Sequence, residues 1–128
     1  MNNNTNKKTK RHFFFPLIAE KIGVGEAIML NHLIFWIVVN IKSYNNHYDG
    51  RTWTYNSVES FKIDYPYWSN SQIRRILKSL VKQGIIIEGN YNKIKYDKTM
   101  WYALKDEKGI LEIYNPFDET EPWEECYR

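Results

Sequence analysis

The chain has 128 residues, a formal net charge of +3 and a single cysteine, Cys126. This length suggests one domain that can bury a single core of modest size. One cysteine excludes a disulfide framework and a cysteine-based metal site, and it fits a reducing, cytoplasmic location. The first residues show no secretory signal, and the most apolar segment, 27–41, is shorter than the roughly 20 residues that span a bilayer.

Charge is distributed unevenly along the chain. Residues 1–11 include four basic and no acidic residues, residues 12–105 have a net charge of +5, and residues 106–128 have a net charge of −6. This division predicts a basic, flexible arm at 1–12, a folded domain at 13–105 and an acidic tail at 106–128. A basic arm and a basic domain favour a polyanionic partner, although each charge run taken alone fits a solvated face equally well.

The first two predicted elements are helices. Pro16 opens a short helix that Gly23 ends. A long apolar helix follows, from near Gly25 to about 43–46. Because its middle, 33–39, is apolar on all sides, we expect it at the centre of the fold.

A short strand and a second helical pattern come next. Asp49 and Gly50 predict a turn, and residues 51–55, "RTWTY", predict a strand. The following helix ends before Pro66. Its N-cap is predicted to be Asn56, with Glu59 completing a capping box and Val58 and Phe61 in the core.

The helix after Pro66 is amphipathic. Ser69 is its N-cap, Gln72 occupies the capping-box position, and Gly84 ends it. One buried face is predicted by the i, i+3, i+4, i+7, i+8 spacing of Ile73, Ile76, Leu77, Leu80 and Val81. At ~100° per residue, the cations Arg74, Arg75, Lys78 and Lys82 lie on the opposite side or its flank.

Residues 85–89 predict a strand, 90–92 a turn and 93–104 a returning strand. The expected fold class is therefore α+β: a winged helix-turn-helix with N-terminal helices, a C-terminal β-hairpin wing and an acidic tail. Within the tail, residues 110–114, "ILEIY", form one candidate strand. Phe117 and Trp123 are candidates to anchor the tail to the domain. The sequence fits both a tail that is docked on the domain and a tail that is free.

This pattern predicts a surface for double-stranded DNA. In helix-turn-helix proteins the N-terminal end of the second helix enters the major groove. A guanidinium group suits guanine or phosphate, and lysines suit phosphate. The candidate DNA-binding residues are Asn70, Ser71, Gln72, Arg74, Arg75, Lys78 and Lys82 on the helix, with Asn92, Lys93 and Lys95 on the wing. The alternative without a DNA-binding role is an amphipathic helix whose polar face is simply solvated, in a small α+β protein.

The sequence favours a protein that is not an enzyme and binds no cofactor or metal. His12, His32 and His47 are scattered without metal-ligand spacing, and His32 is expected in the core or at an interface. The glycines of "GVGE", 23–26, lack the lysine and spacing of a phosphate loop and predict a helix-opening turn. Cys126 lies among acidic residues, which raise a thiol pKa rather than activate the thiol.

The stretch from about Asp49 to Leu104 resembles the winged-helix domain at the N-terminus of phage and plasmid replication initiators of the replisome-organiser type. The residues that carry the resemblance are "DGRTWTYNSVESF", "YPYWSNSQIRRILKSLVKQGIII" and "NYNKIKYDKTMWYAL", together with the preceding helix "GEAIMLNHLIFWI". The resemblance implies a DNA-reading helix at 69–83 and a wing at 90–95. Family members often continue into a second domain that oligomerises or engages the helicase machinery, whereas here a short acidic tail follows.

Two functions therefore compete. The first is double-stranded DNA binding in replication initiation or transcriptional regulation, by a phage- or plasmid-encoded protein. The second is a small phage-type protein-binding module or inhibitor that engages a host nucleic-acid-handling protein through the winged helix or the acidic tail. Its candidate interface anchors are Trp101, Trp123 and Tyr127. The long apolar helix is a candidate homodimer interface. The acidic tail is a candidate to fold over the basic helix and lower its nonspecific DNA binding. No membrane partner is expected.

Overall fold

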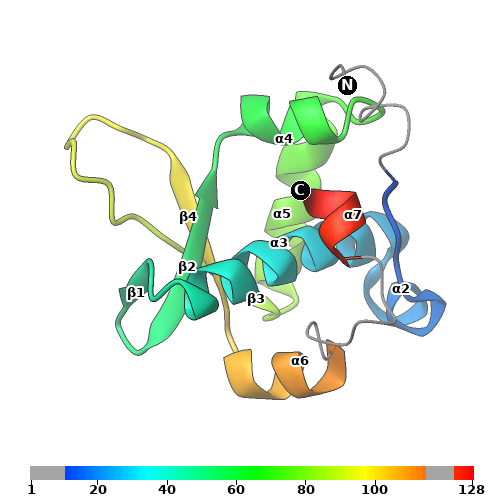
Figure 1. The fold of residues 1–128 in the computed structure, drawn as a ribbon. Coiled ribbons are helices and arrows are strands. Elements are labelled where there is room, and N and C mark those ends of the chain that lie inside the picture. The colour runs from blue at the N-terminus through cyan, green and yellow to red at the C-terminus, as the bar shows by residue number, and fades with distance from the viewer. Residues whose placement is uncertain (1–10, 115–122) are drawn as a thin grey trace, which may run out of the picture.

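The computed structural model describes residues 11–114 and 123–128, which form an α+β fold with six helices and a four-stranded antiparallel sheet (Figure 1). The helices are α2 (Pro16–Ile22), α3 (Val24–Lys42), α4 (Val58–Asp64), α5 (Asn70–Lys82), α6 (Glu107–Tyr114) and α7 (Trp123–Tyr127). The strands are β1 (His47–Tyr48), β2 (Arg51–Asn56), β3 (Ile86–Gly89) and β4 (Met100–Leu104). This order is compatible with the expected winged helix-turn-helix. Most of the expected arm, and the tail residue Phe117, lie outside the described residues.

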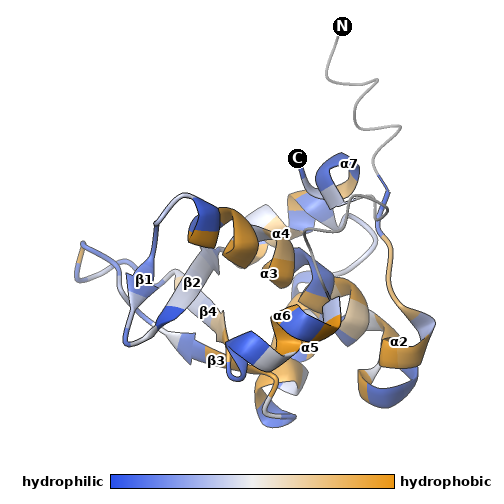
Figure 2. Cartoon of the chain, turned by 60° about the horizontal axis from the view of Figure 1, so that its bottom comes forward, coloured by the Kyte–Doolittle hydropathy of each residue, from blue (hydrophilic) through white to orange (hydrophobic). Residues whose placement is uncertain are grey.

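Helix α3 is central, as its uniform apolarity predicted. Ten of its residues are buried, and α2, α5, α7 and the sheet all pack against it. Figure 2 shows that α3 is hydrophobic along most of its length. By length and composition α3 could also cross a membrane, but its middle is covered by the rest of this chain. The homodimer interface that the sequence suggested for this helix stays a prediction, which would have to use the part of α3 that the rest of the chain does not bury.

The sheet has the strand order β1-β2-β4-β3 and two distinct faces. Because side chains alternate along a strand, Tyr102 and Leu104 of β4 face the main core, while Trp101 and Ala103 face the other way. We call these the inner and the outer face. At the β1–β2 turn, Asp49 and Gly50 have φ values of 54° and 78°, as a two-residue type I′ hairpin turn requires.

Helix α4 begins one residue later than the sequence analysis expected. Asn56 is not its N-cap, because the backbone of Asn56 is paired with Met100 in the sheet and is therefore extended. Ser57 is the N-cap, and its hydroxyl accepts a hydrogen bond of 3.1 Å from the Ser60 N–H. Phe61 is fully buried, as expected, whereas Val58 is only partly buried.

The predicted returning strand at 93–104 is shorter than expected. β4 begins only at Met100, and residues 90–99 form a loop, called here the β3–β4 loop. The side-chain amide of Asn92 donates to the carbonyls of Asp97 (3.0 Å) and Thr99 (2.8 Å). These side-chain hydrogen bonds compete with a longer strand ladder for the carbonyls of the loop.

Residues 110–114 were expected to form a strand and instead belong to helix α6. Asp106 begins the helix by accepting a hydrogen bond of 3.1 Å from the Gly109 N–H. Ile110, Leu111 and Tyr114 pack against the core at helical spacing, while Ile113 is exposed. The apolar alternation in "ILEIY" was misleading because burial follows the helical period here.

The last part of the tail is docked. Trp123, Cys126 and Tyr127 of α7 are buried against α3 and the segment 11–15. The rings of Phe13 and Trp123 lie 5.0 Å apart, and Arg11 forms an ion pair with Glu125. The two ends of the described chain therefore stabilise each other across α3. The nearby His12 hydrogen-bonds through Nδ1 to the Tyr67 hydroxyl at 2.8 Å, so the expected arm contacts the domain at its last two residues.

Candidate nucleic-acid interface

Helix α5 is fixed at both ends by its own sequence. The Ser69 hydroxyl accepts from the Gln72 N–H at 3.1 Å, and the Gln72 side chain accepts from the Ser69 N–H at 2.8 Å, which confirms the predicted capping box. At the other end, Gly84 has a φ of 74°, and the N–H groups of Gly84 and Ile85 donate to the carbonyls of Val81 and Leu80 at 2.9 and 3.0 Å. This is a Schellman motif, and it ends the helix where the sequence predicted.

The apolar face of α5 is buried as expected. Ile73, Ile76, Leu77 and Leu80 are buried, and Val81 is partly buried. A Cβ atom at Gly25 of α3 would lie 2.9 Å from the Ile76 side chain, so the glycine permits the close approach of α3 and α5. The depth of this packing fixes the direction in which the opposite face of α5 points.

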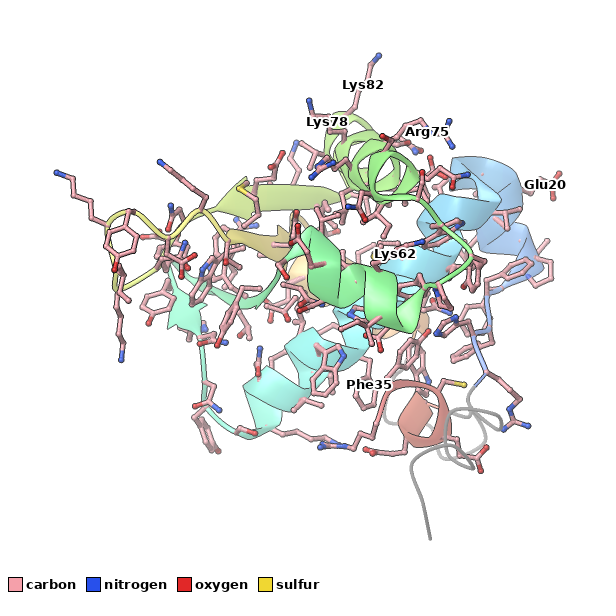
Figure 3. All side chains as sticks on the ribbon, turned by 90° about the horizontal axis from the view of Figure 1, so that it is seen from above. Glu20, Phe35, Lys62, Arg75, Lys78 and Lys82 are labelled. Atoms are coloured by element: carbon pink, nitrogen blue, oxygen red, sulfur yellow. The ribbon has the colours of Figure 1, made fainter. Side chains whose placement is uncertain are left out.

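That opposite face is cationic and lacks partners within the described chain. No acidic residue occurs between Ser69 and Gly84. Its cations are Arg74, Arg75, Lys78 and Lys82, and all four residues are exposed. Their side chains form no hydrogen bond or ion pair with another residue that the structure describes. Figure 3 shows Arg75, Lys78 and Lys82 pointing away from the body of the protein. Such a face favours an external anion.

The first turn of α5 has two free polar side chains and one that is partly used. Asn70 and Ser71 are exposed. Gln72 uses its side-chain oxygen in the capping box, so that only its NH₂ group is available to a ligand. The first turn of α5 therefore offers exposed hydrogen-bonding groups at the end of the helix that enters the major groove in helix-turn-helix proteins.

The turn between α4 and α5 is stabilised by Lys62, which the sequence analysis did not single out. Its ammonium group donates to the backbone carbonyls of Trp68 (2.5 Å) and Pro66 (3.2 Å). Figure 3 shows Lys62 on α4, directed toward the body rather than outward with the α5 cations. These two hydrogen bonds join α4 to the turn that precedes α5. Its position four residues before Pro66 is the only signal that sequence offers for this role.

The β3–β4 loop carries a second set of cations. Lys93, Lys95 and Lys98 are exposed, and Figure 1 shows the loop extending from the sheet on the side away from α2 and α7. The carboxylate of Asp97 accepts a hydrogen bond of 2.9 Å from the Thr99 N–H, which lowers the pKa of Asp97 below its ordinary value. Asp97 therefore remains ionised and makes the loop less basic than its lysines alone suggest.

Asn92, which the sequence analysis named as a candidate DNA contact on the wing, makes its hydrogen bonds within the protein. Its amide donates to two loop carbonyls, and its oxygen accepts a hydrogen bond of 2.7 Å from the indole N–H of Trp101. The side chain makes three hydrogen bonds in this place, and Asn92 would have to give up one of them to contact a ligand. Lys93 and Lys95 remain candidates.

Aromatic contacts attach the β3–β4 loop to the β1–β2 hairpin. The Tyr91 ring is stacked on Tyr48 with centroids 4.6 Å apart, and the Tyr91 hydroxyl donates to the carboxylate of Asp49. Trp53 packs beside Tyr91 at 4.9 Å, in space that a Cβ atom at Gly89 would fill at 2.7 Å. The loop is therefore held at a defined position relative to the sheet.

The described part of the acidic tail does not cover the basic face. Helix α7 packs on α3, and Figure 3 shows it on the opposite side of the molecule from the outward-pointing cations of α5. Its carboxylates have local partners: Glu124 pairs with Arg128 at 2.7 Å and Glu125 pairs with Arg11. The three suggested interface anchors are also inside the protein, since Trp101, Trp123 and Tyr127 are 6%, 3% and 4% exposed.

The histidines are dispersed in the structure as in the sequence. His32 is buried beside Phe61 and Tyr65, which confirms its expected core position, while His47 lies on β1. Across residues 11–114 and 123–128, no group of three His, Cys, Asp or Glu side chains is arranged to bind a metal ion. Comparison of the chain with protein-family models, with curated proteins and with solved structures found no match.

Proposed function

We propose that this protein is a winged-helix protein that binds double-stranded DNA through α5 and the β3–β4 loop. The observation that carries the proposal is the cationic face of α5, which is unpaired, free of acids and rigidly oriented by the packing beneath it. Like charges four residues apart on a helix, such as Lys78 and Lys82, repel each other weakly, and an anion bound to this face would remove that repulsion.

The arrangement of the elements supports the winged-helix assignment. α3, α4 and α5 form the three helices, β2 precedes α4, and β3 and β4 form a hairpin immediately after α5. In this assignment α4 and α5 are the helix-turn-helix, Lys62 fixes their turn, and the β3–β4 loop is the wing.

The two cationic elements have different tasks in this proposal. Asn70, Ser71 and Gln72 approach base edges at the N-terminal end of α5, and Arg74 and Arg75 contact guanine or phosphate. Further along the helix Lys78 and Lys82 contact the phosphate backbone, as Lys93 and Lys95 do from the wing. The resemblance to replisome-organiser proteins favours a phage- or plasmid-encoded protein that acts in replication initiation or transcriptional regulation.

The direct test is fluorescence anisotropy of the full chain with a labelled random-sequence duplex at two salt concentrations. Binding should weaken steeply as salt rises, because each phosphate contact adds about 0.9 to the slope of log K against log salt. Arg75→Ala should weaken binding by about 1–3 kcal/mol if Arg75 contacts a base, and should reduce the slope by about one if it contacts a phosphate. Lys108→Ala, which removes an exposed lysine from α6, is the matched control and should change neither quantity. Equal binding by Arg75→Ala and the natural chain would reject the assigned face.

A second candidate function is recognition of a protein partner, and one observation favours it. Phe14, Ile63 and Tyr67 are 38%, 76% and 54% exposed and line one pocket with Ile28 and Pro66. An exposed apolar surface of this kind is typical of protein interfaces. Retention of one stoichiometric protein by the natural chain after nuclease treatment, and its loss in Ile63→Asp, would support this candidate. Unchanged retention by Ile63→Asp would reject this surface.

A further inference from the structure

The outer face of the sheet forms a second, aromatic cluster separate from the main core. Trp53, Trp101 and Ala103 are its buried members, and Ile87 and Tyr91 pack against them. Trp101 lies at its centre: the rings of Tyr55, Tyr91 and Tyr48 surround it at 4.6, 5.6 and 5.9 Å. Tyr55 is directly opposite Trp101 in the pairing of β2 with β4.

Two of these rings are largely open to solvent. Tyr55 is 53% exposed and Tyr48 is 41% exposed, although each contacts a neighbouring ring of the cluster. The buried rings are sufficient to explain how the β3–β4 loop is attached to the sheet. Two exposed tyrosines on one sheet face provide, in addition, flat apolar surfaces whose positions are fixed by the rings behind them.

Cations adjoin this aromatic surface. The β3–β4 loop, which Tyr91 and Asn92 attach to the cluster, carries the exposed lysines Lys93, Lys95 and Lys98. Of the carboxylates nearby in sequence, Asp49 accepts from the Tyr91 hydroxyl and Asp97 accepts from the Thr99 N–H. Glu88 lies opposite Tyr102 in the β3–β4 pairing and therefore points to the inner side of the sheet, not to the aromatic cluster. The chemistry offered is therefore aromatic faces beside ammonium groups, which complements unpaired bases on a phosphate backbone.

We propose that the outer face of the sheet is a binding site for single-stranded DNA, with bases stacked on Tyr55 and Tyr48 and with phosphates bound by the lysines of the β3–β4 loop. Antiparallel sheets that present aromatic rings bind unpaired bases in this way in other folds. A duplex cannot use this surface equally well, because the faces of its bases are already stacked on one another. The choice of DNA over RNA rests on the proposed function of α5, since strand opening next to a bound duplex would supply the single strand.

The test compares a labelled oligo(dT) strand with a labelled hairpin duplex, each titrated with the full chain at low salt. Tyr55→Ala should lower affinity for oligo(dT) by about 5- to 150-fold, the range expected for the loss of one stacked base. It should leave duplex affinity unchanged. Tyr55→Phe retains the ring and should bind oligo(dT) like the natural chain. Tyr44→Ala removes an exposed aromatic ring beyond the end of α3 and should change neither affinity. A thermal melt of each variant establishes that it is folded.

The outcomes separate this site from the duplex site. Arg75→Ala should weaken duplex binding and leave oligo(dT) binding in place, the reverse of Tyr55→Ala. Absence of oligo(dT) binding, or equal binding by folded Tyr55→Ala, overturns the single-strand site while the duplex proposal stands. Oligo(rU) bound more tightly than oligo(dT) would also overturn the assignment to DNA.

Discussion

The indole N–H of Trp101, on β4, donates a hydrogen bond of 2.7 Å to the side-chain oxygen of Asn92 in the β3–β4 loop. The same amide donates to two carbonyls at the far end of the loop. One side chain therefore joins the two ends of the loop and attaches both to the sheet. The position of the loop lysines depends on this residue, although Asn92 has no free group of its own to offer a ligand.

We expect Asn92→Ala to destabilise the protein by about 1–3 kcal/mol, because Trp101 and two carbonyls lose their partners. The measurement is urea unfolding, with hydrogen exchange of residues 90–99 to locate the effect. Asn92→Asp retains an acceptor for Trp101 but loses both donors. Its free energy of unfolding should lie between those of Asn92→Ala and the natural chain. A stability equal to that of the natural chain would show that the loop does not depend on this amide.

The capping box of α5 yields a second prediction. Ser69→Ala removes one of its two hydrogen bonds and should cost about 1 kcal/mol of unfolding free energy. Ser71→Ala, two residues further on and exposed, should cost close to nothing and serves as the matched control. The midpoint of urea unfolding measures the stability of each variant, provided that the dependence of the unfolding free energy on urea is unchanged. Equal midpoints for Ser69→Ala and Ser71→Ala would contradict a stabilising role of the Ser69 cap.

The docked position of α7 changes what is expected of a tail deletion. A chain that ends at Tyr114 loses Trp123 and Tyr127, which are buried against Phe13 and Phe35. We expect a clear fall in thermal stability, and no rise in affinity for random duplex DNA, because α7 lies away from the basic face of α5. Trp123→Ala alone should cost about 3 kcal/mol. Glu124→Gln removes only an exposed ion pair and is the control. A tighter complex with DNA after the deletion would instead support a masking tail.

Buried tyrosines predict unfolding at alkaline pH. Burial raises the pKa of Tyr102 from 10.0 to about 12 and that of Tyr65 well above 10.0. Because the folded-state pKa is the higher one, the associated stability is complete below pH 10 and is lost as the pH rises toward 12. Circular dichroism and tyrosinate absorbance should therefore change together in that range. Tyrosinate absorbance that rises in full while the fold persists would contradict the burial of these hydroxyls.

Local signals in the sequence predicted several elements correctly. The apolar periodicity of residues 73–81, the capping box and Gly84 defined α5, since each acts within one or two helical turns. Asp49 and Gly50 likewise defined the hairpin turn. The errors have a common cause in tertiary contacts. Asn56 pairs with β4 in the sheet instead of capping α4, and residues 110–114 pack against the core with a helical period. Asn92 hydrogen-bonds across a loop, part of which was expected to be a strand.

The sequence by itself determined that this chain has one central apolar helix, a basic amphipathic helix with defined ends and a following pair of strands. These features depend on the period of apolar residues and on caps, which are local properties of the chain. Only the tertiary structure decided where α7 lies, which face of the sheet carries the aromatic cluster, and which distant groups the side chains of Asn92 and Lys62 contact. Those outcomes depend on contacts between residues far apart in the chain, and no local pattern specifies which distant groups will meet.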